Sequence, residues 1–126
     1  MKKYRVLFCR YTVDGHDRGV LTVMNRCRDA GMEVIYIHFH AVEEIIKTAV
    51  QEDVDVIGIT CSMGEHFSII KELSESLKED SHNIPVIIGG VIPSIDMQRL
   101  KAMGVKEVFG PGSSPDEAIE FISRLS

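Results

Sequence analysis

The hydrophobic positions of this chain alternate between two spacings along its whole length. Nearly continuous apolar runs rich in Val and Ile, typical of strands covered on both faces, lie at 5–10, 33–38, 55–60, 85–88 and 106–109. Between them the apolar residues recur every three or four positions, which is helical spacing, at 18–30, 41–52, 65–79 and 94–103. A last helix is predicted to open with Ser114-Pro115-Asp116-Glu117, in which a cap is followed by a proline at the first helical position and by early acids. The pattern therefore predicts β–α units repeated to the end of the chain.

Such units joined by short connections predict an α/β fold with right-handed crossovers. We expect a flavodoxin-like, doubly wound five-stranded parallel sheet in the order 2-1-3-4-5, inside a three-layer αβα arrangement. In sheets of this kind, ligands bind at the carboxyl ends of the strands, near the point between strands one and three where the order reverses. Functional residues are therefore expected in the loops that follow the strands.

Composition narrows the class of protein. The 126 residues suit a single domain, 1–126, and no apolar run approaches the roughly 18 residues that a membrane helix needs. The basic start leads into an apolar run too short for a signal peptide, so we expect a cytoplasmic protein. The formal charge of −5 argues against nucleic acid as the main partner. The three cysteines, Cys9, Cys27 and Cys61, lack metal-type spacing and are expected to be buried, reduced thiols.

The loops after four of the predicted strands are rich in small residues. They read Tyr11-Thr12-Val13-Asp14-Gly15-His16, Thr60-Cys61-Ser62-Met63-Gly64, Gly89-Gly90-Val91-Ile92-Pro93 and Gly110-Pro111-Gly112-Ser113. One glycine pair is ordinary turn chemistry, but four such loops at one edge indicate a site that a bulky, flat ligand can approach closely. No loop has a G-x-G-x-x-G or G-x-x-x-x-G-K-[ST] pattern, which argues against those nucleotide folds. Thr60 stands where a phospho-acceptor receiver domain would need an aspartate, which argues against a receiver domain.

The stretch Asp14-Gly15-His16-Asp17-Arg18-Gly19 carries the clearest chemistry. A ligating imidazole needs its second ring nitrogen held by a carboxylate or carbonyl, and Asp14 lies two residues before His16. One histidine and one carboxylate do not close a zinc site. They suit a metal whose other ligands are supplied by a macrocycle, with one axial position left for the protein.

Asp14-x-His16-x-x-Gly19 followed by Gly89-Gly90 is similar to the motifs of cobalamin-binding domains in B12-dependent mutases and methyltransferases. The strings 14–19, 89–93 and 109–112 resemble most the acyl-CoA mutase branch, the methylmalonyl-CoA mutase relatives, over essentially the whole chain. The resemblance implies a base-off/His-on cofactor: the dimethylbenzimidazole base leaves the cobalt and its nucleotide tail is buried in the domain. His16 would then be the lower axial cobalt ligand, with Asp14 as its hydrogen-bonded partner.

The resemblance also implies which residues bind the cofactor. His16 is the metal ligand, no residue is assigned as catalytic beyond tuning of that ligand by Asp14 and Arg10, and His66 is expected to begin its helix beside the tail cavity. The implied cofactor-binding residues are Asp14, Gly15, His16, Asp17, Arg18, Gly19, Thr60, Ser62, Gly64, His66, Gly89, Gly90, Val91, Phe109, Gly110, Pro111 and Gly112.

Two segments depart from the family pattern. The second motif, usually Ser-x-Leu, reads Thr60-Cys61-Ser62, which keeps a hydroxyl and loses an apolar group. Mutase relatives tend to carry a lysine four residues before the motif aspartate and a glycine two before it, where this chain has Arg10 and Thr12. Arg10 could still pair with Asp14, but it is always charged and bulkier than lysine. The remaining histidines, His38, His40 and His82, are expected at the surface.

The resemblance implies the small, adenosylcobalamin-binding subunit of a heteromeric acyl-CoA mutase, a radical carbon-skeleton isomerase. A large barrel subunit would bind the acyl-CoA, and the small chain alone would be inactive. The alternative is a corrinoid methyl-carrier protein of a B12-dependent methyltransferase system. Such carriers usually have a helical cap domain before the motif, for which too few residues precede the first strand here. A cobalamin-sensing regulator would need an output domain.

Overall fold

The computed structural model describes residues 3–11 and 18–125. Its strands are β1 (Arg5–Tyr11), β2 (Glu33–Phe39), β3 (Val56–Cys61), β4 (Val86–Gly90) and β5 (Glu107–Phe109). They form one parallel sheet in the order β2-β1-β3-β4-β5, so the predicted topology is confirmed.

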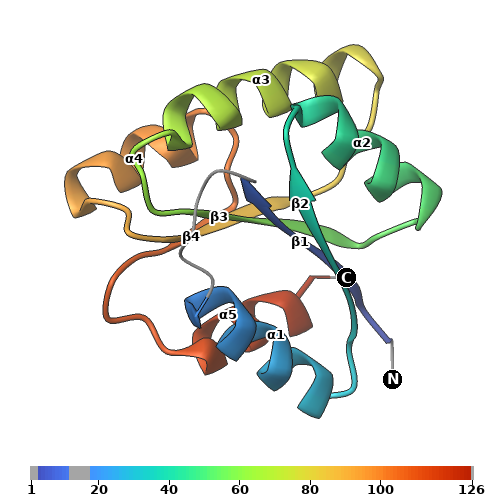
Figure 1. The fold of residues 1–126 in the computed structure, drawn as a ribbon, viewed down its shortest axis with the longest axis vertical. Helices are drawn as coiled ribbons and strands as arrows, with labels where there is room; N and C mark the ends of the chain where they lie inside the picture. Colours follow the sequence, from blue (N-terminus) through green and yellow to red (C-terminus); the bar gives the residue numbers. More distant parts are fainter. Residues whose placement is uncertain (1–2, 12–17, 126) are drawn as a thin grey trace.

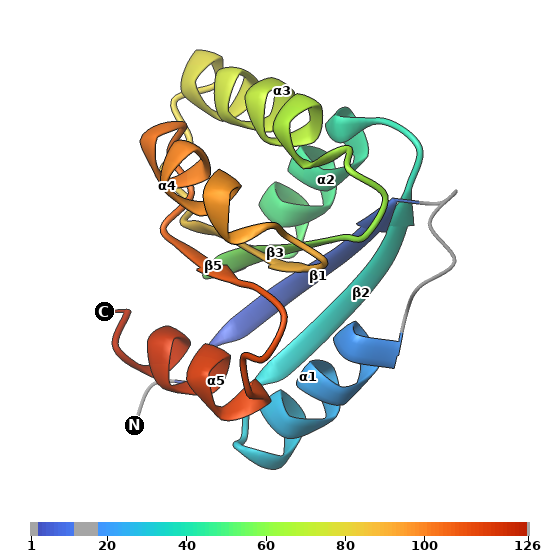
Figure 2. The ribbon, with the colours of Figure 1, turned by 90° about the vertical axis from the view of Figure 1, so that its left-hand side faces the viewer.

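The helices cover both faces of this sheet (Figure 1). On one face lie α2 (Val42–Gln51), α3 (His66–Glu79) and α4 (Ser94–Ala102); on the other lie α1 (Arg18–Asp29) and α5 (Pro115–Ser123). Figure 2 shows the same three layers from the side, with α1 and α5 next to each other. Within the part of the chain that the structure describes, no helix is long and apolar enough to cross a membrane.

Successive side chains of β1 point to opposite faces of the sheet and belong to two different hydrophobic clusters. Leu7 and Cys9 belong to the cluster under α2, α3 and α4, whereas Val6 and Phe8 belong to the cluster under α1 and α5. Because both faces are covered, the strand is apolar at successive positions, which is the pattern that the sequence shows. The amphipathic helices then bury one side each against these two surfaces.

The start of α5 confirms the capping prediction and fixes this helix beside α1. The backbone N–H of Ser114 donates to a carboxylate oxygen of Glu117 at 3.1 Å, and Pro115 is the first helical residue. Asp116 forms an ion pair with Arg26 of α1. These contacts define the pair of helices that borders the site described below.

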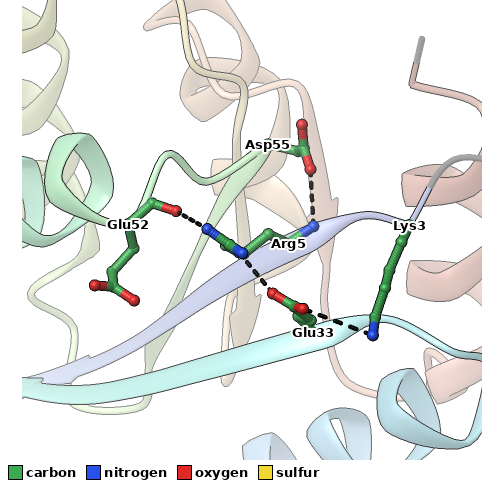
Figure 3. A network of polar contacts seen from close by, with 5 residues as sticks. All are labelled: Lys3, Arg5, Glu33, Glu52 and Asp55. Atoms are coloured by element: carbon green, nitrogen blue, oxygen red, sulfur yellow. Dashed lines mark hydrogen bonds and ion pairs between the residues drawn. The ribbon is translucent and has the colours of Figure 1, made fainter.

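A polar network around Arg5 fixes the amino ends of β1, β2 and β3 (Figure 3). The Arg5 backbone N–H donates to Asp55 Oδ2 at 2.8 Å, its Nε donates to Glu33 Oε2 at 2.7 Å, and its Nη1 donates to the Glu52 carbonyl at 2.6 Å. The hydrogen bond from Arg5 holds the pKa of Glu33 below its usual value. Charged residues thus secure the edge of the sheet that lies opposite the glycine-rich loops.

Position 90, the last residue of β4, requires glycine, because neighbouring atoms leave no space for a side chain. Its φ is +116°, and a Cβ added there would lie 2.1 Å from the carbonyl oxygen of Cys61. That same oxygen accepts a hydrogen bond from the Val91 N–H at 2.9 Å. The close approach joins the loops that follow β3 and β4.

We predict that Gly90→Ala destabilises the protein far more than Gly31→Ala. Gly31 has a similar positive φ of +88° but nothing within 4 Å of an added Cβ, so its replacement should cost only backbone strain, about 1 kcal/mol. At Gly90 an alanine would have the same backbone strain and would also clash with the Cys61 backbone. That backbone cannot move without breaking the hydrogen bonds between β3 and β4. Urea unfolding followed by circular dichroism measures both variants, and equal losses would contradict this account.

The three cysteines are buried and free, as the sequence predicted. Burial raises the pKa of Cys27 to about 11 and raises the pKa of Cys9 further. The thiolate is the reactive form of cysteine, so burial disfavours the reaction of these two groups at neutral pH. Thiol chemistry is therefore not a candidate activity for Cys9 or Cys27.

We predict that the native protein at pH 8 reacts with an aromatic disulfide reagent roughly 10²-fold more slowly than the urea-unfolded protein, because the thiolate is rare and covered. The unfolded chain should release three equivalents of chromophore. Lys47→Cys, which places a thiol on the exposed side of α2, is the matched control and should add one rapid equivalent to the native protein. Rapid labelling of the native wild type would show that the cysteines are accessible.

Candidate functional site

A cavity of about 460 Å³ lies between the sheet and the helices α1 and α5. Its volume falls within the range of about 300–1,000 Å³ common for ligand pockets. Strand residues and the loops after β4 and β5 form one side, and residues of α1 and α5 form the other. The cavity therefore lies toward the carboxyl ends of the strands, where the topology predicts a ligand.

The floor of the cavity depends on a glycine inside a strand. Gly58 of β3 is the register partner of Phe8 on β1, and a Cβ at Gly58 would lie 3.0 Å from the Phe8 ring. The ring thus occupies the space of the missing side chain, and both residues line the cavity. Sequence reasoning missed this pair, although a glycine within the run Val56–Cys61 is the usual sign of a close approach.

Gly89 and Gly110 contribute backbone to one wall of the cavity, and the space where their side chains would lie is occupied by other protein atoms. An added Cβ at Gly89 would lie 3.4 Å from the Phe109 carbonyl oxygen, and one at Gly110 would lie 2.3 Å from Met97 Cε. Phe109 lines the cavity beside them, together with Pro111 and Gly112. The loops after β4 and β5 thus converge, as the sequence predicted, and present backbone to a ligand.

The structure brings many of the predicted cofactor-binding residues together and places others elsewhere. Those that line the cavity are Gly19, Thr60, Gly89, Gly90, Phe109, Gly110, Pro111 and Gly112. Those outside its lining are Ser62, Gly64, His66 and Val91. Asp14, Gly15, His16 and Asp17, with the side chain of Arg18, lie outside the described residues. Sequence reasoning missed the helical side of the cavity, formed by Val20, Thr22, Val23, Pro115 and Ala118.

His66 begins its helix, as expected, but it does not line this cavity. His66 is the first residue of α3, which covers the opposite face of the sheet from α1 and α5. Its side chain is buried, and its Nε2 lies 2.9 Å from Asp96 Oδ2 on α4. The neighbouring Phe67 ring lies 4.3 Å below the guanidinium carbon of Arg99, also on α4. His66 therefore joins α3 to α4.

Three polar residues form a row across the carboxyl ends of β2, β1 and β3. Arg10 is the register partner of His38 on one side and of Thr60 on the other, so all three point to the face that α1 and α5 cover. Arg10 is only 9% exposed, and its Nη2 lies 3.2 Å from Nε2 of His38. Thr60 lines the cavity, whereas Arg10 and His38 do not, so this row, which we call the polar row, meets the cavity only at its β3 end.

This arrangement suits a flat, largely apolar group with few polar atoms. The floor is aromatic, one wall is backbone, and Thr60 offers a hydroxyl that can donate or accept a hydrogen bond. Residues 12–17 join β1 to α1, and both of these elements contribute residues to the cavity. Among the residues that the structure describes, no group of three His, Cys, Asp or Glu side chains could hold a metal ion.

Comparison with known proteins agrees with this geometry. The family model described as B12 binding domain matches residues 4–120. The chain is 40% identical over 123 residues to the pivalyl-CoA mutase small subunit of Xanthobacter autotrophicus, covering 96% of this chain and 82% of that protein. It is also 40% identical to the 2-hydroxyisobutanoyl-CoA mutase small subunit of Aquincola tertiaricarbonis, covering 96% and 90%.

A methylmalonyl-CoA mutase of Cereibacter sphaeroides is 37% identical over 98% of this chain, which corresponds to 18% of that enzyme. Among solved structures, a cobalamin-binding protein from Desulfitobacterium hafniense has a TM-score of 0.83 at 17% identity, covering 99% of this chain and 60% of the other. The likeness to that structure concerns the fold, whereas the family model and the mutase relatives concern the sequence itself. On those grounds the chain belongs to the B12-binding domain family.

Proposed function

We propose that this chain is the cobalamin-binding small subunit of an adenosylcobalamin-dependent acyl-CoA mutase, an isomerase of carbon skeletons. Residues 1–126 would form a single cobalamin-binding domain that is inactive without its partner, and a cytoplasmic location stays a prediction. The observation that carries the proposal is the glycine-walled cavity of about 460 Å³, in a chain 40% identical to two acyl-CoA mutase small subunits. The acyl-CoA remains unassigned, because its pocket would belong to the partner.

The residues around the cavity fit the nucleotide tail of cobalamin. The Phe8 and Gly58 floor offers an apolar surface for an aromatic base, and the backbone at Gly89 and Gly110 can pass close to a bulky group. The Thr60 hydroxyl would bond a nitrogen of the base. These residues would enclose the tail and exclude water from it.

His16 is our proposed lower axial ligand of cobalt, held by Asp14. Support comes from the motif itself and from the position of 12–17 between β1 and α1, which both border the cavity. A carboxylate partner would fix the tautomer of the His16 imidazole and raise its basicity. The chemistry that bound adenosylcobalamin supplies is homolysis of its cobalt–carbon bond. The chain's own residues would orient the axial imidazole and shield the lower face.

We predict that the chain binds adenosylcobalamin in the base-off/His-on form and that His16→Ala abolishes the His-on absorption spectrum. The cavity residues are unchanged in this variant, so some binding of the tail should remain. His40→Ala, which alters an exposed histidine before α2, is the control and should keep the wild-type spectrum. An unaltered spectrum in His16→Ala would remove the axial-ligand assignment.

The proposed partner is a large barrel-domain mutase subunit that binds the acyl-CoA. The relatives named as small subunits imply a larger partner for those proteins. Around the carboxyl edge of the sheet, this chain exposes the apolar side chains Met63, Val91 and Ile95, the last of them 86% exposed. Exposed apolar residues grouped at one edge are typical of an interaction surface. We infer that the large subunit covers this edge and closes the cofactor between the two proteins.

We predict that Ile95→Glu weakens association with the large subunit about tenfold or more, because a charge replaces an apolar contact. Adenosylcobalamin binding by the isolated chain should stay unchanged, since Ile95 does not line the cavity. Val50→Glu is the control: Val50 is an exposed apolar residue at the far end of α2. Size-exclusion chromatography or calorimetry with the large subunit measures both variants, and unchanged association of Ile95→Glu would place the interface elsewhere.

A further inference from the structure

The lining of the cavity is polar where it meets solvent and apolar where it is buried. Thr22, Ser113 and Ser114 contribute hydroxyl-bearing side chains, and all three residues are exposed. Thr60 is half-buried and adds a hydroxyl between the two zones. The buried zone includes four apolar side chains that are at most 6% exposed: Phe8, Val20, Ile87 and Ala118. The cavity therefore offers its hydrogen-bonding side chains mainly at its mouth.

The described residues give the interior few other hydrogen-bonding groups. None of the described residues that line the cavity has a carboxylate, amide, imidazole, amine or guanidinium side chain. The carbonyl groups of Gly90 and Gly110 already accept hydrogen bonds, from the Ile92 N–H at 3.0 Å and from the Ser113 N–H at 3.1 Å. A ligand group buried here must therefore be satisfied by Thr60 or be apolar.

This distribution distinguishes between the aromatic bases that can end a corrinoid tail. Dimethylbenzimidazole is flat and largely apolar, and its free ring nitrogen needs a partner that the Thr60 hydroxyl can supply. Adenine is also flat, but it carries an amino group and further ring nitrogens, which water satisfies outside the protein. Burying such groups without partners is costly, and that cost discriminates against the ligand that carries them.

The side chains of the helical side can vary in polarity more freely than those of the sheet side. On the sheet side, the Phe8 ring occupies the space where Gly58 has no side chain, so a change there disturbs a strand pair. On the helical side, Val20 and Val23 of α1 and Ala118 of α5 line the cavity. Val23 is only half-buried, so a polar side chain of similar size at this position would give the cavity an acceptor without altering the sheet.

We propose that Val20, Val23 and Ala118 are specificity-determining residues, which select a corrinoid with a benzimidazole-type tail base over one with a purine tail base. The inference rests on the proposed function, because it places the tail in this cavity. The apolar helical side leaves the amino group of a purine without an acceptor. The hydroxyl groups at the mouth stay available to the sugar and phosphate that connect the base to the corrin.

The test compares adenosylcobalamin with the otherwise identical corrinoid whose tail base is adenine, by equilibrium dialysis against the isolated chain. We expect the Kd of the adenine form to be roughly tenfold higher or more, because its polar groups lose water without gaining partners. Dialysis measures the bound corrinoid by its absorbance, so it does not depend on a spectral change on binding. Equal Kd values, or a lower Kd for the adenine form, would overturn the proposal.

A variant of the helical side shows whether these residues set the preference. Val23→Asn places an amide in the lining and should reduce the ratio of the two Kd values roughly fivefold, because its oxygen can accept a hydrogen bond from the amino group of adenine. The ratio cancels any loss of stability, which affects both corrinoids alike. It also cancels the different tendencies of the two free bases to bind their own cobalt.

Leu21→Asn is the matched control, because Leu21 is an exposed residue of the same helix that does not line the cavity. It should keep the wild-type ratio. Ala118→Ser adds a hydroxyl from α5 and should lower the ratio in the same direction, so it decides the question if Val23→Asn does not fold. A wild-type ratio in the folded variants of the lining would show that the helical side does not select the base.

The outcomes separate this inference from the proposed function. If the wild type binds neither corrinoid, the proposed function fails. If the wild type binds both corrinoids with equal Kd, only the selection of the tail base fails.

Discussion

The contact between Phe8 and Gly58 is the constraint on which the site depends. Parallel strands bring register partners side by side, and here one partner is an aromatic ring and the other has no side chain. A methyl group at Gly58 would come within 3.0 Å of the ring and would move it into the space between the sheet and the helices. Because the ring can lie over the strand, a cavity remains in the layer that elsewhere is filled by side chains.

The two faces of the sheet therefore differ: one is closely packed, and the other contains the cavity. The face under α2, α3 and α4 is closely packed, and its polar contacts, such as that between His66 and Asp96, join one helix to another. The face under α1 and α5 combines a buried cluster, which includes Val6, Met24 and Ile122, with the cavity, which lies toward the carboxyl ends of the strands. The network around Arg5 secures the amino ends of β1, β2 and β3. The same layer thus contains both buried core residues and the cavity.

The sequence predicted the fold well because hydrophobic periodicity is a local property. Each strand and helix could be identified from its own residues, and short connections left the order 2-1-3-4-5 as the expected topology. The convergence of Thr60, Gly89 and Gly110 followed, since carboxyl ends of parallel strands meet at one edge. The family assignment, which came from the motifs, is confirmed by the match over 4–120 and by the mutase relatives.

The sequence did not predict which face of the sheet each helix covers. His66 follows a loop at the correct edge, but periodicity does not tell which side of the sheet its helix covers, and α3 covers the other side. The helical side of the cavity was missed for the same reason, because Val20 and Ala118 look like ordinary core residues. His38 was correctly expected at the surface, but its hydrogen bond to Arg10 depends on strand register. Register follows from the assembled sheet, so no local pattern could reveal it.

The polar row also shows what a guanidinium needs from its neighbours at position 10. An ammonium group is compact and can satisfy its hydrogen bonds by rotating, whereas a guanidinium needs acceptors in the plane of its fork. Arg10 is 9% exposed, so an acceptor beside its guanidinium offsets part of the cost of burying it. His38 lies at the register position on β2 that faces Arg10, and its Nε2 lies 3.2 Å from Arg10 Nη2.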